Sequence, residues 1–223
     1  MKPECAKCGS RTKLCRSSEG QGPAFCPTVQ QKEVIEKANR EYVKPGVLHF
    51  AQQASIQEGE GYINRDVKPF VLHPAKPRVQ EICEFAQKSG YKRLGVAFCS
   101  GLHTEALSLT HILEAQGFEV ISVVCKAGRT PKEYIGIKDE EKVRIGEFEP
   151  MCSPIAQAMI LNEEKTDFNI LVGLCVGHDS LFLKYSEAYC TVLVAKDRVL
   201  GHNPCAALYT AGSYYARMLK KGF

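Results

Sequence analysis

Short apolar runs alternate with amphipathic stretches along the second half of the chain. The runs RLGVAF, FEVISVV, FNILVGL and CTVLVAKDRVL predict buried strands at residues 93–98, 118–124, 168–174 and 190–200. The stretches between and after them predict helices over residues 103–117, 153–166, 179–188 and 204–222. This alternation predicts an α/β fold of three layers. A mainly parallel, doubly wound (Rossmann-like) sheet would be covered by helices on both faces.

The first 90 residues follow a different pattern. Residues 1–27 are rich in Gly, Ser, Lys and Cys and nearly free of large apolar side chains. They cannot form a hydrophobic core and need a cross-link, such as a bound metal or disulfides, to be stable. Helices are predicted over residues 28–42, with Thr28 as N-cap, then over 45–60 and 77–89. We therefore predict a cysteine-rich metal-binding segment at 1–27 and an α/β domain at 28–223. The helical lead-in of that domain covers 28–90, and its alternating part covers 91–223.

Composition and charge exclude several classes of function. The apolar content of 44% is normal for a globular protein, and the net charge of +4 is spread along the chain, so we expect no nucleic-acid partner. No apolar run is long enough to cross a membrane, and the start MKPECAKC lacks the apolar stretch of a secretory signal. We therefore expect a cytoplasmic protein without a membrane partner.

The cysteine content points to metal or redox chemistry. Eleven cysteines are present, and this odd number leaves one unpaired in any scheme made only of disulfides. Disulfide frameworks are also typical of short secreted chains, whereas thiols in the cytoplasm stay reduced. Ligation of a metal or a redox reaction is therefore the favoured interpretation.

Four cysteines stand where strands end or where a helix begins: Cys99, Cys125, Cys152 and Cys175. In a parallel sheet, the connections that leave the strands share one edge, which is where open α/β sheets bind ligands. We therefore expect the four thiols to gather there and to hold a cofactor. The alternative is that each is a small buried hydrophobic residue, an interpretation that suits Cys83 and Cys190. Cys205 follows the fourth strand and is a candidate fifth thiol.

Histidines accompany these cysteines. His178 and His103 each lie a few residues after a cysteine, at a predicted helix start, and are candidate catalytic proton donors or metal ligands. For His178, packing beside a helix cap formed by Asp179 or Ser180 is the alternative. His202 lies near the same edge.

The N-terminal cysteines form a second set with the spacing C-x2-C-x6-C-x10-C: Cys5, Cys8, Cys15 and Cys26. A CxxC pair offers two thiolates to a tetrahedral metal, and the other two cysteines complete a four-sulfur shell. Zinc sites usually have a second CxxC or CxxH pair, which this segment lacks, and its spacing is not that of a ferredoxin either. The sequence therefore does not decide between Zn²⁺ and an iron–sulfur cluster.

The strings CAKCG, MCSPIAQAMILNEEKTDFNILVGLCVGHDSLF and TVLVAKDRVLGHNP resemble an uncharacterised family of cysteine-rich proteins of anaerobic archaea and bacteria, described as predicted metal-binding proteins. The resemblance covers nearly the whole chain. It implies metal ligation by both cysteine sets and no particular reaction. An anaerobic source would favour iron–sulfur clusters.

These observations lead to three hypotheses. The first is an iron–sulfur protein with two all-cysteine sites, of the [4Fe-4S] kind, that transfers electrons or reduces a small molecule. The second is a protein with structural Zn²⁺ and a binding or sensing role. The third is a thiol-dependent hydrolase or transferase with Cys175 as nucleophile and His178 as base. No phosphate-binding glycine loop is present. The redox partner or substrate is not identified, and the C-terminal helix makes a second copy of the chain a candidate partner.

Overall fold

The structure is a computed structural model that describes residues 1–222. The chain divides into two compact units, Met1–Glu60 and Gly61–Phe223, and each is described by itself. None of the helices in residues 1–222 is long and apolar enough to cross a membrane. The predicted cysteine-rich segment 1–27 is the first part of the first unit, and its boundary at residue 27 stays a prediction.

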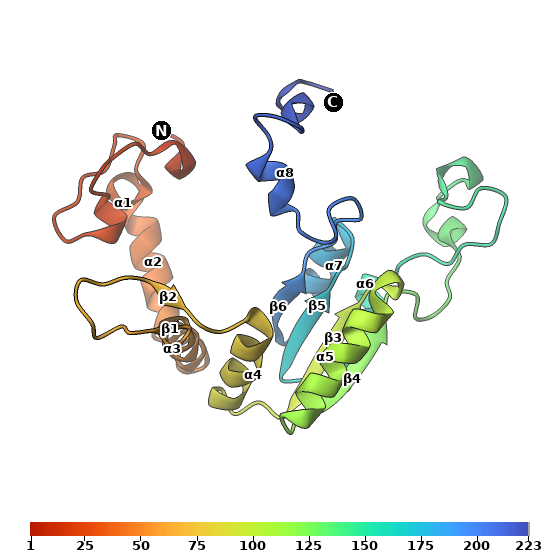
Figure 1. The fold of residues 1–223 in the computed structure, drawn as a ribbon. Coiled ribbons are helices and arrows are strands. Elements are labelled where there is room, and N and C mark those ends of the chain that lie inside the picture. Colours follow the sequence, from red (N-terminus) through yellow and green to blue (C-terminus); the bar gives the residue numbers. More distant parts are fainter. Residues whose placement is uncertain (223) are drawn as a thin grey trace. The chain divides into compact units, whose positions relative to one another are not determined.

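The second unit is built around a sheet of four parallel strands. They are β3 (Arg93–Phe98), β4 (Glu119–Val124), β5 (Phe168–Val172) and β6 (Tyr189–Val194), in the spatial order β4-β3-β5-β6 (Figure 1). Leu94 of β3 pairs with Val120 on one side and Phe168 on the other. The two central strands, β3 and β5, are buried along nearly their whole length, as their continuous apolar runs predict. A short antiparallel pair, β1 (Tyr62–Ile63) and β2 (His73–Pro74), precedes the sheet.

Helices cover both faces of the parallel sheet. They are α4 (Arg78–Lys88), α5 (His103–Ala115), α6 (Pro154–Glu163) and α7 (His178–Tyr185) (Figure 1). Side chains alternate between the faces of β3: a Cβ on Gly95 would meet Leu161 of α6, whereas the Phe98 ring contacts His103 of α5. Helix α7 packs against α6, and α4 lines a cavity together with α5. The predicted three-layer α/β fold is therefore confirmed.

The connections that leave β3 and β5 lead to opposite faces, because β3 continues into α5 and β5 into α7. In doubly wound sheets, such a divergence between neighbouring strands opens a crevice at their carboxyl ends. Gly173, just after β5, has a φ of +67°, and a Cβ there would lie 2.6 Å from the Leu102 side chain in the β3–α5 connection. The two connections therefore approach one another closely, with Cys99 on one and Cys175 on the other.

Two predicted elements near the C-terminus are wrong in length. Strand β6 ends at Val194 and not at residue 200, because the Asp197 carboxylate accepts hydrogen bonds from the N–H groups of Val199 and Leu200 and turns the chain. The helix predicted over 204–222 is instead the short α8 (Cys205–Tyr209), followed after a break by the 3-10 turn η6 (Ala216–Leu219). The sequence Thr-Ala-Gly-Ser at 210–213 lies between them, and its glycine and hydroxyl residues disfavour a continuous helix.

The first unit contains helices but no hydrophobic core. Its helices are α1 (Pro27–Gln30), α2 (Lys32–Tyr42) and α3 (Pro45–Glu60), and two 3-10 turns precede them, η1 (Cys5–Lys7) and η2 (Leu14–Arg16). The helix expected over 28–42 begins one residue earlier, with Cys26 and not Thr28 at the N-cap, and is interrupted at Gln31. In Met1–Glu60, every residue of which is described, only Cys26 and Gln57 are buried.

Candidate functional site

The carboxyl edge of the sheet carries four cysteines. Cys99 and Cys125 directly follow β3 and β4, Cys175 lies three residues beyond β5, and Cys152 lies two residues before α6. The first two are buried, whereas Cys152 and Cys175 are partly exposed. The parallel topology thus places all four at the edge that the strand pattern predicts. Three of them follow strands, and Cys152 precedes a helix.

Cys125 and Cys152 form a thiol pair in direct contact at this edge. Their Sγ atoms are 3.8 Å apart. The backbone beside them is fixed, because the N–H of Ser153 donates to the carbonyl of Cys125 over 2.7 Å. A further donor, the N–H of Ser100, lies 3.4 Å from the Cys125 sulfur. The pair therefore joins the end of β4 to the start of α6 at a rigid point of the fold.

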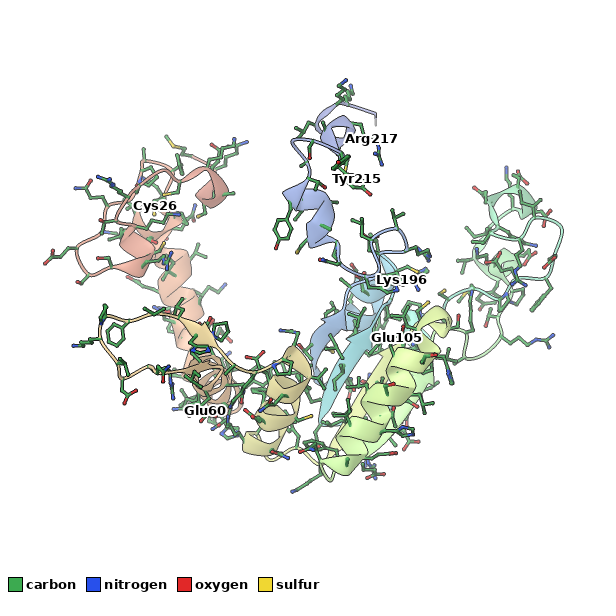
Figure 2. The ribbon with its side chains drawn as sticks, viewed as in Figure 1. Cys26, Glu60, Glu105, Lys196, Tyr215 and Arg217 are labelled. Carbon is green, nitrogen blue, oxygen red and sulfur yellow. The ribbon has the colours of Figure 1, made fainter. Side chains whose placement is uncertain are left out.

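Basic side chains surround the same thiols. Lys196 Nζ donates to the Cys99 sulfur over 3.2 Å, and an Arg198 guanidinium nitrogen donates to the Cys175 sulfur over 3.0 Å. Both residues lie just beyond β6, where Figure 2 labels Lys196. Lys126 follows Cys125 directly and interacts electrostatically with Cys152. Positive charge near a thiol stabilises the thiolate that binds metals and acts as a nucleophile.

The shared environment separates the pKa values of two neighbouring thiols. The pKa of Cys152 falls from 9.0 to about 6, first because the Cys125 thiol donates a hydrogen bond to its thiolate, with a further contribution from Lys126. The pKa of Cys99 rises from 9.0 to about 12, first because of its hydrogen bond with Cys125 and second because of burial. At neutral pH in the metal-free protein, Cys152 is therefore mostly thiolate and Cys99 stays protonated.

A cavity of about 450 Å³ opens in front of the thiols. Its wall includes three of the cysteines, four basic residues and an apolar part: Cys99, Cys152, Cys175, Lys126, Lys132, Lys196, Arg198, Ile135, Ile137, Val143 and Met151. The apolar part comes from the connection between β4 and α6, whose ends meet in an isolated bridge between Pro131 and Pro150.

An ion pair holds this loop in shape. Lys132 Nζ lies 2.8 Å from the Glu149 carboxylate, which also accepts hydrogen bonds from the N–H groups of Val143 and Arg144. These contacts, with that of Lys132 first, lower the pKa of Glu149 from 4.5 to about 2. Glu149 therefore stays ionised and neutralises Lys132. Lys126, Lys196 and Arg198 are the other basic groups of the cavity wall.

His178 and His103 differ in position. His178 begins α7 at the cavity wall, and its buried Nδ1 has no hydrogen-bond partner among the described residues. Burial is the main reason that the pKa of His178 is lowered, so the imidazole is neutral at pH 7. His103 begins α5, is exposed, and packs its ring against Phe98. It does not belong to the cavity wall.

The remaining cysteines of the second unit lie elsewhere. Cys83 is buried within α4, and Cys190, at the opposite end of the sheet, points its thiol at the carbonyl of Ala188 over 3.3 Å. Burial raises the pKa of both thiols. Cys205 is exposed at the start of α8 and is not part of the cavity wall.

The N-terminal cysteines lie around irregular turns in the first unit. The N–H of Cys8 donates to the carbonyl of Cys5 over 3.1 Å, which gives the CxxC pair a tight turn. Hydrogen bonds from Ser10 lower the pKa of Cys8. Cys5 and Cys15 are exposed and Cys26 is buried.

Neither cysteine set is drawn together into a complete ligand shell. Within residues 1–222, no group of three or more His, Cys, Asp or Glu side chains is placed to hold a metal ion. The Cys125–Cys152 pair, with its sulfurs 3.8 Å apart, has the spacing of two ligands on one metal. With metal–sulfur bonds of about 2.3 Å, the edge of a tetrahedron is about 3.8 Å. The two ligand sets, and the roles of His178 and His103, stay predictions.

The basic groups of the cavity are the feature that sequence reasoning missed. Lys126 lies two residues after β4 and directly follows Cys125, so the rule that located the cysteines would also have located it. Lys196 and Arg198 lie two and four residues after β6, but the fourth strand was predicted to continue to residue 200, so the rule did not place them at the edge. The position of Lys132 and of the apolar loop side chains at the cavity could not be predicted from the sequence, because a polar connection has no periodic pattern of apolar residues.

Comparisons with known proteins identify a family without a described function. A family model described as "Protein of unknown function (DUF1847)" matches residues 26–193. The uncharacterized protein MJ0455 of Methanocaldococcus jannaschii is 41% identical over 219 residues, which span 98% of this chain and 99% of the relative. No solved structure matches the chain significantly. The resemblance to an uncharacterised family is confirmed.

Proposed function

The chain belongs to the family of proteins of unknown function DUF1847, and we propose that its sheet edge is a redox centre in which Cys99, Cys125, Cys152 and Cys175 hold an iron–sulfur cluster. Its task would be electron transfer or the reduction of a small molecule. The observation that carries the proposal is the convergence of thiols and basic side chains on one open cavity.

The charges of the site suit an all-thiolate centre. Four cysteine thiolates around a cluster leave net negative charge, which is costly to bury without nearby cations or hydrogen-bond donors. Lys196 and Arg198 already donate to the Cys99 and Cys175 sulfurs, and Lys126 lies by Cys152. Hydrogen bonds to ligand sulfur also tune the reduction potential of a cluster. The same contacts would therefore offset charge and set the potential.

The open cavity favours a reactive centre over a purely structural one. Structural zinc sites are closed, with four protein ligands and no space for another molecule. Here about 450 Å³ of space adjoins three of the thiols, so a small molecule can approach them. A bound cluster would supply single electrons. Neutral His178, which lines the cavity, would exchange protons with the molecule being reduced. His103 is exposed beside Phe98 and does not line the cavity, so it is less suited to this proton exchange.

The first unit supports a second metal. Sixty residues with Cys26 as their sole buried hydrophobic residue lack the core that stabilises a small domain. Metal ligation by Cys5, Cys8, Cys15 and Cys26 would supply that stability, and a cluster there would pass electrons onward.

Zinc is the second candidate, and one observation favours it. The 3.8 Å separation of the Cys125 and Cys152 sulfurs equals the edge of a single tetrahedral metal site and suits two ligands of the same ion. In that case the sheet edge would bind or sense a ligand without redox chemistry.

The metal content of anaerobically purified protein tests the proposal. We expect iron with acid-labile sulfide and a brown colour. Cys152→Ser should lose the sheet-edge share of iron, and Cys8→Ser the N-terminal share. Cys190→Ser, at the opposite end of the sheet, is the matched control and should keep both. A colourless protein with stoichiometric zinc and no sulfide would establish the zinc alternative instead.

A further inference from the structure

We propose that the sheet edge, when its sulfurs carry no metal, exchanges its Cys125–Cys152 thiol pair with an anionic low-molecular-weight disulfide. Cys152 would be the attacking thiol and Cys125 the resolving thiol, and the product would be a Cys125–Cys152 disulfide. This activity goes beyond the proposed metal centre, because it uses the same sulfurs in their unligated state.

The order of attack follows from exposure. Cys152 is partly exposed and belongs to the cavity wall, whereas Cys125 is only 2% exposed and lies behind it. A molecule in the cavity therefore reaches the Cys152 sulfur first. Cys152 also lies two residues before the ten-residue helix α6, whose N-terminal end favours a negative charge.

The geometry places the second step within reach. The Cys125 sulfur is 3.8 Å from that of Cys152, in van der Waals contact. The Ser153–Cys125 backbone hydrogen bond of 2.7 Å keeps the two chain segments adjacent. Closing the pair to a bond of about 2.05 Å requires side-chain rotation with little backbone movement.

The reaction balances in two steps. The Cys152 thiolate attacks one sulfur of the small disulfide, which breaks its S–S bond, forms a mixed disulfide and releases one small thiolate. Cys125 then loses its proton to that thiolate and attacks the Cys152 sulfur, which releases the second small thiolate. Two protein thiols are oxidised, one small disulfide is reduced to two thiols, and the proton of the Cys152 thiol, lost when its thiolate formed, protonates the second product.

The cavity wall selects the class of co-reactant. Four basic residues line it, Lys126, Lys132, Lys196 and Arg198, against two carboxylates, Glu141 and Glu149. Glu149 pairs with Lys132, and Glu141 accepts a hydrogen bond from the N–H of Lys138, so the wall keeps a net positive charge. Concentrated positive charge in a cleft attracts anions and raises their association rate. Hydrophobic Ile135, Ile137 and Val143 on the loop side would contact the aliphatic part of the same molecule. A peptide-like disulfide with carboxylates, such as oxidised glutathione, has this combination.

The reaction can be followed on the full chain. Protein stripped of metal by a chelator under reducing conditions is desalted and mixed with oxidised glutathione. Free thiols are then blocked in denaturant, and the linked peptides are identified by mass spectrometry. We expect a Cys125–Cys152 linkage in the wild type. We expect glutathione trapped on Cys152 in Cys125→Ser, and unmodified Cys125 in Cys152→Ser. Cys190→Ser should behave as the wild type.

Charge selectivity tests the co-reactant. Cystamine, a cationic disulfide, should oxidise the pair more slowly than oxidised glutathione, by roughly tenfold at low salt. Arg198→Met should reduce the rate with glutathione and leave the rate with cystamine unchanged or higher. Equal rates for the two disulfides would overturn the assignment to an anion. A linkage that excludes Cys125 or Cys152, or glutathione that persists on wild-type Cys152, would overturn the pair itself.

The outcome is separable from that of the metal proposal. If the purified protein holds neither iron nor zinc, the metal proposal fails. The exchange proposal is then decided separately, by whether oxidised glutathione produces the Cys125–Cys152 linkage. If metal-loaded and stripped protein react equally fast, Cys125 and Cys152 are not metal ligands, and the exchange is upheld. If only stripped protein reacts, both proposals are supported.

Discussion

Replacing Cys125 with alanine should remove most of the unusual acidity of Cys152. In the metal-free protein the pKa of Cys152 is about 6, and the largest cause is the hydrogen bond from the Cys125 thiol to the Cys152 thiolate. Alanine has no donor, so the neutral form of Cys152 gains relative to the thiolate and the pKa rises. The Lys126 charge stays in place, so the pKa should stop short of its ordinary value of 9.0.

The expected change in reactivity is large. A thiol with a pKa of about 6 is about 90% thiolate at pH 7, whereas one at the ordinary value of 9.0 is about 1% thiolate. If the substitution raises the pKa of Cys152 above 7, less than about half of it is thiolate at that pH. Cys125 is buried and loses only a sulfur atom, so the cost to folding is about 1 kcal/mol and the fold should persist.

Alkylation by iodoacetamide across a pH series measures this directly. Peptide mapping gives the rate at Cys152 alone, and the midpoint of rate against pH reports its pKa. Lys126→Met should shift the midpoint upward by less than Cys125→Ala, because Lys126 is the smaller cause. Cys190→Ala should leave the midpoint unchanged. A wild-type midpoint near 9, or an unshifted midpoint in Cys125→Ala, would refute the reasoning.

Three further predictions concern the fold and the N-terminal metal, and the first has a control variant. Gly95→Ala would push a Cβ against the fully buried Asn169 side chain, and we expect a loss of about 3 kcal/mol in urea unfolding. Gly46→Ala, whose Cβ meets nothing within 4 Å, should be tolerated. Lys142→Met removes a nearly buried ammonium that two acidic side chains of the β4–α6 loop share, so limited proteolysis should cut this loop faster. Cys26→Ser should lose the N-terminal metal and expose Met1–Glu60 to protease, while the metal of the sheet edge is retained.

The sheet and the position of its cysteines could be predicted because both depend on local patterns. Buried parallel strands require continuous apolar runs, and the four runs lie close to the four observed strands. The carboxyl ends of parallel strands share one edge whatever the intervening sequence, so Cys99, Cys125 and Cys175 could be placed together without further information. Cys152 followed from the same rule, since the helix that precedes β5 begins at this edge.

The rest depends on tertiary contacts that leave no periodic trace. The loop between β4 and α6 is held by the Lys132–Glu149 pair and the Pro131–Pro150 bridge, and neither can be read from a polar stretch of sequence. The closing helix was predicted too long because apolar residues at helical spacing outweighed the weak propensity of residues 210–213. Cys205 and His103 follow the right elements but do not belong to the cavity wall, since a side chain next to an edge can still point away from it.

The four sulfurs of the sheet edge fall into two kinds. Cys125 and Cys152 are in contact and are tied together through the backbone. Cys99 and Cys175 stand on either side of the point where the connections from β3 and β5 diverge, and each accepts a hydrogen bond from a long basic side chain. The first pair is therefore pre-arranged to chelate a metal or to close as a disulfide, and it requires little movement for either. The second pair sits where a crevice forms and where flexible cations can follow a change of charge. A centre that gains and loses electrons needs both features, because its ligands must be fixed while its surroundings adjust to each added charge.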